Sequence, residues 1–211
     1  MDILYKPLSD GKCMIAIFDF FGVVVDWKSD YVIPVFARYA GISDAVVKQK
    51  MKIDFALCDT GKISVSELFL RLGKSFRVDP SGLEGVFREC LENKAKLNTE
   101  VVKVIQSLPD AVLLSNQMPL HTEFARSKGW FSCFSRLFFS FEIGFAKPSP
   151  ESYLFVLKAL GVRPEDSVFV DDKQENVDGA VSVGMRAVLF KDANQLSREL
   201  SKFYKLEKTK K

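Results

Sequence analysis

The chain of 211 residues has a net charge of +3 and 47% apolar side chains, which suits one large domain, or one domain with a smaller insertion, around a sizeable core. Part of the positive charge lies in residues 205–211, and the rest shows no basic face of the kind that binds nucleic acid. No uncharged apolar stretch approaches the ~20 residues that span a bilayer, and the four cysteines form no CxxC pair. Because the N-terminal residues are also polar and mixed, we expect a soluble cytoplasmic protein with reduced thiols and no nucleic-acid or membrane partner.

The first expected element is a buried strand near the N-terminus. Residues 14–25, MIAIFDFFGVVV, form a dense apolar run that is rich in β-branched side chains and is interrupted by Gly22. A short run of this kind indicates a buried strand that enters a loop. Asp19 lies within this run, after the apolar residues IAIF.

The following segment, residues 30–96, carries helix signals and no convincing strand. Ser64 and Glu67 form a capping box ahead of an apolar helical stripe, and a second stripe follows near Phe87. We therefore expect a small all-helical cap inserted after the first strand. Asn98 or Thr99 then caps a helix that leads back into the core.

The rest of the chain alternates strands with helices. Strands are expected at 111–114, 137–139, 168–170 and 187–190, with one helix from Pro150 to about Leu160 and another from about Gln174 to Val183. This alternation predicts an α/β fold, a Rossmann-like parallel sheet with helices on both faces. The expected organisation is a core of residues 12–29 and 97–205, a cap of residues 30–96, and a frayed basic tail of residues 206–211.

Three of the expected strands end in polar residues. Carboxyl ends of parallel strands share one edge of a sheet, and ligands bind at that edge. Lys147, in the loop GFAKPSP before a capped helix, could reach the same place. The residues at the strand ends are Asp19, Ser115 with Asn116, and Asp171 with Asp172.

Such a constellation suits phosphoryl transfer beside a divalent cation. Three carboxylates at one site repel each other and need a counter-charge, and Mg²⁺ prefers oxygen ligands. A carboxylate can also attack phosphorus, giving an aspartyl-phosphate that divides one hard step into two easier ones. A lysine and a hydroxyl or amide donor stabilise the charge on the transferred group.

Four stretches resemble, in family order, motifs of the haloacid dehalogenase superfamily, a large group of mostly Mg²⁺-dependent phosphatases. The resemblance covers roughly residues 14–29 and 98–190, and the helical insertion is similar to the family's cap. The residues of these motifs are similar to those of the branch that contains a bacterial sugar-1-phosphate phosphatase and the amino-terminal phosphatase domain of epoxide hydrolases. The stretches are FDFFGVVVD (18–26), LLSNQ (113–117), FAKPSPESY (145–153) and VFVDDKQENVDGA (168–180).

The resemblance implies catalytic and phosphate-binding roles for four residues. Asp19 would be the nucleophile. Ser115, with the backbone amide of Asn116, would bind the phosphoryl oxygens. Lys147 would pair with both the nucleophile and the phosphate.

The resemblance also implies a Mg²⁺ site. Asp19, Asp172 and the backbone carbonyl of Phe21 would ligate the ion. Asp171 would act directly or through a water molecule. Asn176 would orient a water molecule or the loop that carries Asp172.

Phe21 is a departure from the family pattern. Phosphatases of this family usually carry a second Asp at that place, as general acid and base, which is worth typically ~10²–10⁴-fold in rate. A phenyl side chain cannot move a proton. The departure predicts a slow phosphatase, another proton carrier or no turnover. Dehalogenases of the family also lack this Asp, but they tend to replace the acids near Asp171 and Asp172 with neutral residues.

Three functions therefore stay open. The main hypothesis is Mg²⁺-dependent hydrolysis of a small phosphorylated metabolite through an aspartyl-phosphate. The second is a metal-independent 2-haloacid dehalogenase-like hydrolase. The third is a catalytically idle member that binds a phosphorylated ligand or a partner protein.

Smaller candidates surround the predicted site. His121, the only histidine, could touch the substrate, and Trp27 and Tyr31 could line the substrate cavity. Plain packing is the alternative for all three. Asp26 could substitute as the proton carrier, because the turn from strand to cap could fold it toward the site, although it could equally be a helix cap or a loop carboxylate.

Overall fold

The computed structural model describes residues 4–6 and 14–207. Its centre is a five-stranded parallel sheet with the order β6-β5-β2-β7-β8. The first strand therefore lies in the middle of the sheet, and later strands add on both sides of it. The strands are β2 (Ile15–Phe18), β5 (Ala111–Ser115), β6 (Arg136–Phe139), β7 (Ser167–Asp171) and β8 (Arg186–Leu189). These strands confirm the expected ones, with limits that differ by one or a few residues.

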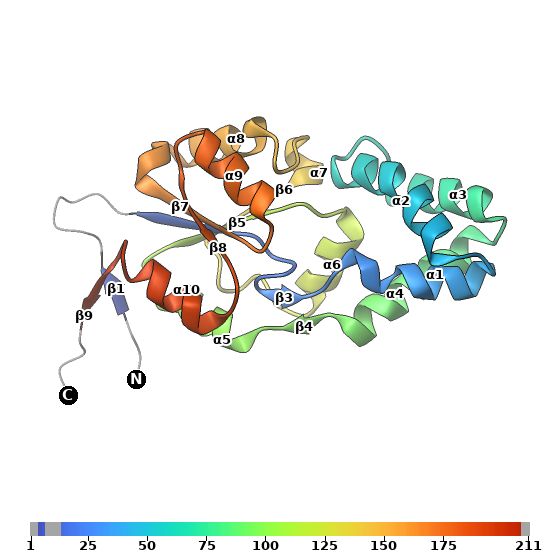
Figure 1. Cartoon of the computed structure of the whole chain (residues 1–211), viewed down its shortest axis with the longest axis horizontal. Helices are drawn as coiled ribbons and strands as arrows, with labels where there is room; N and C mark the ends of the chain where they lie inside the picture. The colour runs from blue at the N-terminus through green and yellow to red at the C-terminus, as the bar shows by residue number, and fades with distance from the viewer. Residues whose placement is uncertain (1–3, 7–13, 208–211) are drawn as a thin grey trace.

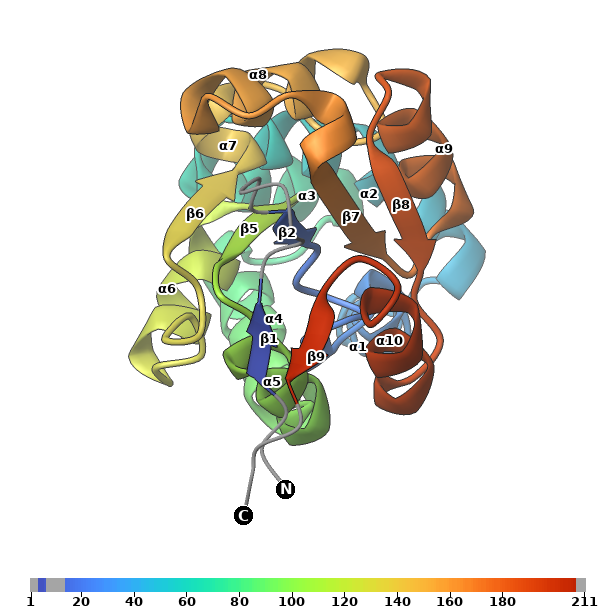
Figure 2. The ribbon, with the colours of Figure 1, turned by 90° about the vertical axis from the view of Figure 1, so that its left-hand side faces the viewer.

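Helices cover both faces of the sheet (Figures 1 and 2). Alternate residues of the central strand point to opposite faces: Ala16 and Phe18 pack in one apolar cluster, and Ile17 packs in the other. One face packs against α5 (Thr99–Gln106), α6 (Pro119–Ser127) and α10 (Ala193–Leu200), and the other against α8 (Pro150–Leu160) and α9 (Gln174–Ser182). The predicted fold class is confirmed. The short helices η1 (Ser29–Tyr31), α7 (Ser140–Ile143) and η2 (Pro164–Asp166) complete the connections.

Four helices form a separate layer beyond one end of the sheet (Figure 1). They are α1 (Ile33–Ala40), α2 (Asp44–Asp59), α3 (Val65–Phe76) and α4 (Pro80–Lys94). The Ser64 hydroxyl accepts a hydrogen bond from the Glu67 amide at 3.1 Å, which starts α3 as the capping box predicts. The buried ring of Phe87 contacts the rings of Phe36 and Phe69 and joins the helices together.

The chain enters and leaves this helical layer through a small antiparallel ladder that the sequence analysis missed. Strand β3 (Val25–Asp26) pairs with β4 (Lys96–Leu97), and the amide of Asn98 donates to the carbonyl of Val24 at 2.8 Å. Strands of two residues are too short for an alternating pattern to emerge. The ladder brings the two chain crossings side by side.

A second short ladder corrects the expectation of a frayed tail. Strand β1 (Leu4–Lys6) pairs in antiparallel fashion with β9 (Lys205–Glu207), so the prediction is wrong for residues 206 and 207, whose backbone groups find partners in β1. The remaining tail residues 208–211 lie outside the described residues, as do residues 12 and 13 of the expected core. Cys58, Cys90 and Cys133 are free thiols. Within the described ranges, no helix has the length and apolar character needed to cross a bilayer.

The helical layer also touches the core at the end of α2. The Ser140 hydroxyl at the start of α7 donates a hydrogen bond to the carbonyl of Asp59. Two residues later, Gly61 has φ +68°, and a Cβ there would lie 2.4 Å from the carbonyl oxygen of Phe141. The turn after α2 therefore fits closely against α7.

We predict that Gly61→Ala lowers the free energy of unfolding more than Gly41→Ala. Both glycines have left-handed backbones, with φ +68° and +65°, which cost an L-residue roughly 1–2 kcal/mol. Only Gly61 faces a backbone oxygen, whereas nothing lies within 4 Å of a Cβ at Gly41. Urea unfolding of both variants measures the difference, and equal losses would contradict the close contact.

Candidate active site

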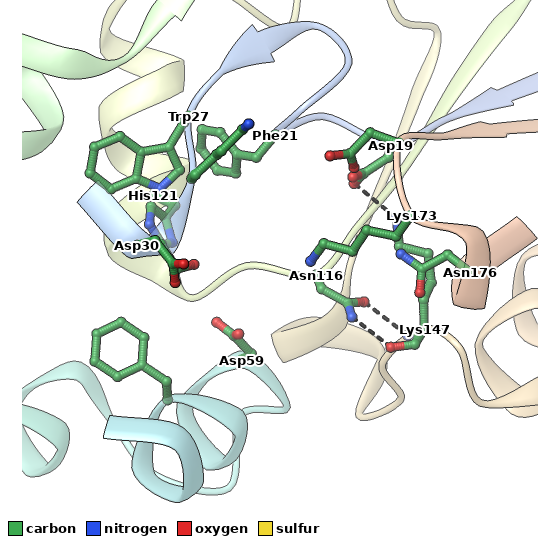
Figure 3. A pocket seen from close by; sticks show the side chains of 14 residues that line it. Asp19, Phe21, Trp27, Asp30, Asp59, Asn116, His121, Lys147, Lys173 and Asn176 are labelled. Atoms are coloured by element: carbon green, nitrogen blue, oxygen red, sulfur yellow. Dashed lines mark hydrogen bonds and ion pairs between the residues drawn. The ribbon is translucent and has the colours of Figure 1, made fainter. Parts of the chain in front are cut away.

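The carboxyl ends of three adjacent strands meet in one place (Figure 3). Asp19 directly follows β2, and its backbone amide donates to the carbonyl of Val170 in β7 at 2.8 Å. Asp171 ends β7 and Ser115 ends β5. Lys147 arrives from the loop before α8, and its side chain is buried. The structure thus brings together residues that the sequence analysis placed at the strand ends.

Lys147 is the centre of a buried group of three charges. Its Nζ lies 2.8 Å from Oδ1 of Asp19 and 2.7 Å from Oδ2 of Asp171. Burial alone lowers the pKa of Lys147, but the two carboxylates outweigh burial, and the pKa is raised. Asn116 fixes the lysine's backbone, because its side chain accepts from the amide of Lys147 at 2.9 Å and donates to its carbonyl at 2.8 Å.

Asp19 has the electrostatic setting expected of a nucleophilic carboxylate. Burial raises the pKa of Asp19 to about 6, although Lys147 opposes this shift, and Asp171 adds to it. At neutral pH the carboxylate form therefore predominates, in a site from which most water is excluded. A desolvated carboxylate held by a lysine is suited to attack on an electrophile.

Asp171 holds other groups in place instead of facing the cavity. Its oxygens accept from Lys147, from the side-chain amide of Asn176 at 3.0 Å, and from the backbone amide of Lys173 at 2.9 Å. Asn176 is anchored in turn by the hydroxyl of Tyr153, which donates to its carbonyl at 2.7 Å. These contacts favour the water-mediated version of the role expected for Asp171. They place Asn176 on Asp171, whereas the resemblance pointed to a water molecule or the Asp172 loop.

Asp172 offers an oxygen that the described residues leave without a partner. Its Oδ1 is buried with no hydrogen bond, and the pKa of Asp172 is raised by burial and by Asp171. One carboxylate oxygen each from Asp19, Asp171 and Asp172 lie within 4.8 Å of one another. Gly22 leaves space for this carboxylate, because a Cβ there would lie 2.4 Å from Oδ2 of Asp172. An all-oxygen donor set with an orphaned carboxylate oxygen fits Mg²⁺.

The loop after β5 is held by a residue that the sequence analysis gave no role. Gln117 is buried, donates from its backbone amide to Ser140 Oγ at 3.0 Å, and donates from its side chain to Thr122 Oγ1 at 2.7 Å. Ser115 Oγ lies 3.5 Å from Gln117 Oε1. In the sequence, the one feature that could have indicated this role is the position of Gln117 in the stretch LLSNQ, two residues after Ser115.

A cavity of about 400 Å³ lies between the core and the helical layer. The core contributes its polar side, with Asp19, Lys147 and Asp172. An aromatic side faces it, with Phe21, Trp27, Phe55 and His121. Asn116 and Asn176 also line the cavity, and so do Asp30 and Asp59 (Figure 3). Ser115 is buried at the end of β5 and is not among the lining residues.

His121 belongs to the aromatic side of this cavity. Its ring centroid lies 5.0 Å from that of Phe21 and 6.1 Å from that of Trp27. Burial lowers the pKa of His121 to about 3, so the ring is neutral at physiological pH. Neither ring nitrogen has a hydrogen-bond partner within the described part of the chain. A bound ligand could therefore use either nitrogen.

The structure does not bring two of the smaller candidates, Asp26 and Tyr31, into the cavity. Asp26 is exposed on β3, accepts from the hydroxyl of Tyr31 at 3.3 Å, and does not line the cavity, because the β3–β4 ladder directs it to solvent. Tyr31 is likewise absent from the lining, whereas Trp27 is part of it. Asp59, from the helical layer, was missed because an acid at the end of a cap helix matches no motif.

Comparison with known proteins agrees with this geometry. A model of the haloacid dehalogenase-like hydrolases matches residues 13–184. The sesquiterpene phosphatase astK of Aspergillus oryzae is 28% identical over 193 residues, which cover 88% of this chain and 93% of that protein. Flavin mononucleotide hydrolase 1 of Arabidopsis thaliana is 45% identical over 58 residues, so the chain spans only 24% of that relative.

The fold has been solved in a similar protein. The crystal structure of a haloacid dehalogenase-family enzyme of Bacteroides thetaiotaomicron, in complex with magnesium and inorganic phosphate, matches with a TM-score of 0.71 and 18% identity. The match covers 85% of this chain and 94% of that one.

We predict that Lys147→Met lowers the free energy of unfolding by about 3–5 kcal/mol at pH 7 in the presence of a chelator, because removal of one partner leaves buried carboxylates uncompensated. The matched control is Lys158→Met, since Lys158 is exposed on α8 away from the cavity and its loss should change stability by less than about 0.5 kcal/mol. Denaturant unfolding of both variants measures this. Similar effects of the two substitutions would show that the buried ion pairs contribute little.

Proposed function

We propose that this chain, which belongs to the haloacid dehalogenase-like hydrolases, hydrolyses the phosphate ester of a small metabolite with the help of Mg²⁺. The single observation that supports this most strongly is the orphaned Oδ1 of Asp172 beside the pair of Asp19 and Lys147. That arrangement supplies a nucleophile, a counter-charge and a carboxylate oxygen able to ligate a metal ion, all at one place. The phosphatase relative and the magnesium- and phosphate-bound structure point in the same direction.

The proposed reaction begins at Asp19. One carboxylate oxygen of Asp19 attacks phosphorus, a new O–P bond forms, and the bond from phosphorus to the ester oxygen breaks. A water molecule then attacks the aspartyl-phosphate, releases inorganic phosphate and returns Asp19 to its starting form. Lys147 aims the Asp19 carboxylate and offsets negative charge, while Ser115 and the backbone amide of Asn116 would bind phosphoryl oxygens.

Asp19, Asp172 and the backbone carbonyl of Phe21 would hold the metal ion, with Asp171 joining through a water molecule. When bound, Mg²⁺ supplies positive charge against the phosphoryl oxygens. The substrate would be small, since a cavity of about 400 Å³ lies at the lower end of the usual range for ligand sites. The retained pair Asp171 and Asp172 favours this reaction over metal-independent dehalogenation.

A screen of phosphate esters tests the proposal as a whole. Release of inorganic phosphate that requires Mg²⁺ and stops in a chelator supports it. Release of halide from 2-haloacids without metal would replace it with the dehalogenase alternative. Binding of phosphorylated ligands without turnover of any ester would indicate an idle member of the family.

Asp19→Asn should abolish phosphate release while the fold is retained. The amide is nearly isosteric with the carboxylate but cannot attack phosphorus. Steady-state assays at equal folded protein, judged by circular dichroism, measure the loss. Residual activity above about 1% of the wild-type rate would show that Asp19 is not the nucleophile, because the covalent route depends on a carboxylate at this position.

Asp172→Ala should lose Mg²⁺ binding. Isothermal titration of the unmodified chain should show one site, because the donor set holds one cluster among the described residues. Asp178→Ala, which removes an exposed carboxylate on α9, serves as the control and should bind as the unmodified chain does. Equal binding by Asp172→Ala would place the metal elsewhere.

A further inference from the structure

The leaving group needs a proton that Phe21 cannot supply. Phe21 stands at the edge of the aromatic side, with its ring 5.0 Å from His121 and 6.5 Å from Trp27. If the chain is a phosphatase, as proposed above, an ester oxygen must still leave as a hydroxyl and a water molecule must still lose a proton. Another group that faces the cavity must therefore carry that proton.

Most titratable groups of the cavity are unsuited to this task. Lys147 is held by two buried ion pairs, and His121 is neutral because burial lowers its pKa to about 3. Lys28 and Lys173 line the cavity but are exposed to solvent, whereas a proton carrier must be held in a fixed position beside the reacting atoms.

The acids of the cavity leave one candidate. Four carboxyl groups line it within the described ranges: Asp19, Asp30, Asp59 and Asp172. Asp19 is the proposed nucleophile and Asp172 the proposed metal ligand. Asp30 is exposed and pairs with Lys48 at 3.5 Å. Asp59 has no role assigned above, and it forms no ion pair within the described residues.

Asp59 lines the cavity from the helical layer, whereas Asp19, Lys147 and Asp172 line it from the core. It is the last residue of α2, and Figure 3 shows its carboxyl group directed into the space between the aromatic residues and Lys173. Its Oδ1 is buried without a hydrogen-bond partner in the described structure. Its carbonyl accepts from Ser140 Oγ, which in turn accepts from the amide of Gln117. Through the Ser140 hydroxyl, hydrogen bonds therefore connect the main chain of Asp59 to the loop that follows Ser115.

We infer that Asp59 is the general acid and base of this active site, in place of the residue that Phe21 replaces. Its surroundings suit the role. Burial raises the pKa of Asp59 from 3.8 to about 7, and Lys173 opposes that shift. Cys58, on the same helix, is also an electrostatic neighbour of Asp59. The cavity that Asp59 lines holds further charged or titratable groups, namely Asp19, Lys28, Asp30, His121, Lys147 and Asp172. A carboxyl group that is half protonated near neutral pH can donate in one step and accept in the next.

The proton balance follows from the two steps. In the first, the electron pair of the breaking P–O bond goes to the ester oxygen, which takes the proton of the Asp59 carboxyl and leaves as an alcohol. In the second, the Asp59 carboxylate takes a proton from the attacking water, whose oxygen bonds to phosphorus as the bond to Asp19 breaks. Asp59 is then protonated and Asp19 is a carboxylate again.

The test is Asp59→Asn, assayed with Mg²⁺ on 4-nitrophenyl phosphate and on an alkyl phosphate. The alkyl ester should lose about 10²-fold or more, within the range of general acid–base catalysis. 4-Nitrophenol leaves without protonation, so a rapid burst of about one equivalent should remain, followed by slow turnover because water activation is lost. The basic limb of the wild-type kcat/KM profile near pH 7 should also be absent from Asp59→Asn.

Controls separate this role from a structural one. Asp54→Asn, on the same helix but outside the cavity, should change none of these readouts. Asp59→Glu should recover part of the alkyl phosphatase activity, and so should Phe21→Asp in the Asp59→Asn background, compared at equal folded protein. Above pH 7, Asp59→Asn should unfold at the same or a higher temperature, because a raised pKa means that the wild-type loses stability as this carboxyl ionises.

The outcomes are distinguishable. If the unmodified chain hydrolyses esters and Asp59→Asn keeps full alkyl phosphatase activity, or loses burst and steady state equally on both esters, the inference is overturned and the proposed function stands. If the unmodified chain releases no phosphate from any ester with Mg²⁺, the proposed function fails and the inference fails with it. Selective loss on the alkyl ester with a preserved burst supports the inference.

Discussion

The contact of one buried ammonium group with two buried carboxylates is the constraint on which the rest of this structure depends. Lys147 lies between Asp19 and Asp171 at 2.8 and 2.7 Å. Charges removed from water are tolerated only when they are paired and their remaining hydrogen bonds are satisfied. That requirement explains why Asn116 fixes the lysine's backbone and why Asn176 donates to Asp171. It also ties β2, β7 and the loop before α8 to one arrangement.

The two sides of the cavity differ in polarity, and this difference shapes the chemistry. On the core side, paired charges surround Asp19, and one oxygen of Asp172 lacks a partner. On the other side, the rings of Phe21, Trp27 and His121 exclude water without offering a charge. Low polarity beside a charged cluster strengthens each electrostatic contact within it. It also raises the pKa of any carboxyl group that the helical layer brings into the cavity, as happens at Asp59.

The sequence was informative wherever the structure is local or motif-bearing. An apolar run that ends in a polar residue located Asp19 and Asp171, because parallel strands align their carboxyl ends. The same reasoning could not find Gln117's contact with Ser140, since that hydrogen bond joins the loop after β5 to the start of α7, two segments that are distant in the sequence. Proximity in sequence was misleading for the proton carrier. Asp26 follows the first strand closely but is turned to solvent, whereas Asp59 arrives from a distant helix through tertiary packing.

Because the β3–β4 ladder pairs the two ends of the helical insertion, the insertion can be replaced as one unit. Val25 is paired with Leu97 and Asp26 with Lys96, so the boundaries of the insertion are adjacent neighbours in a sheet, roughly 5 Å apart between Cα atoms. Recombination could exchange everything between them for a two-residue hairpin turn, or for a domain of another shape, without moving the paired charges at Lys147. A lineage in which this exchange took place would keep the nucleophile of the core and lose the carboxyl group of Asp59. In this architecture, bond cleavage and proton delivery are separately heritable.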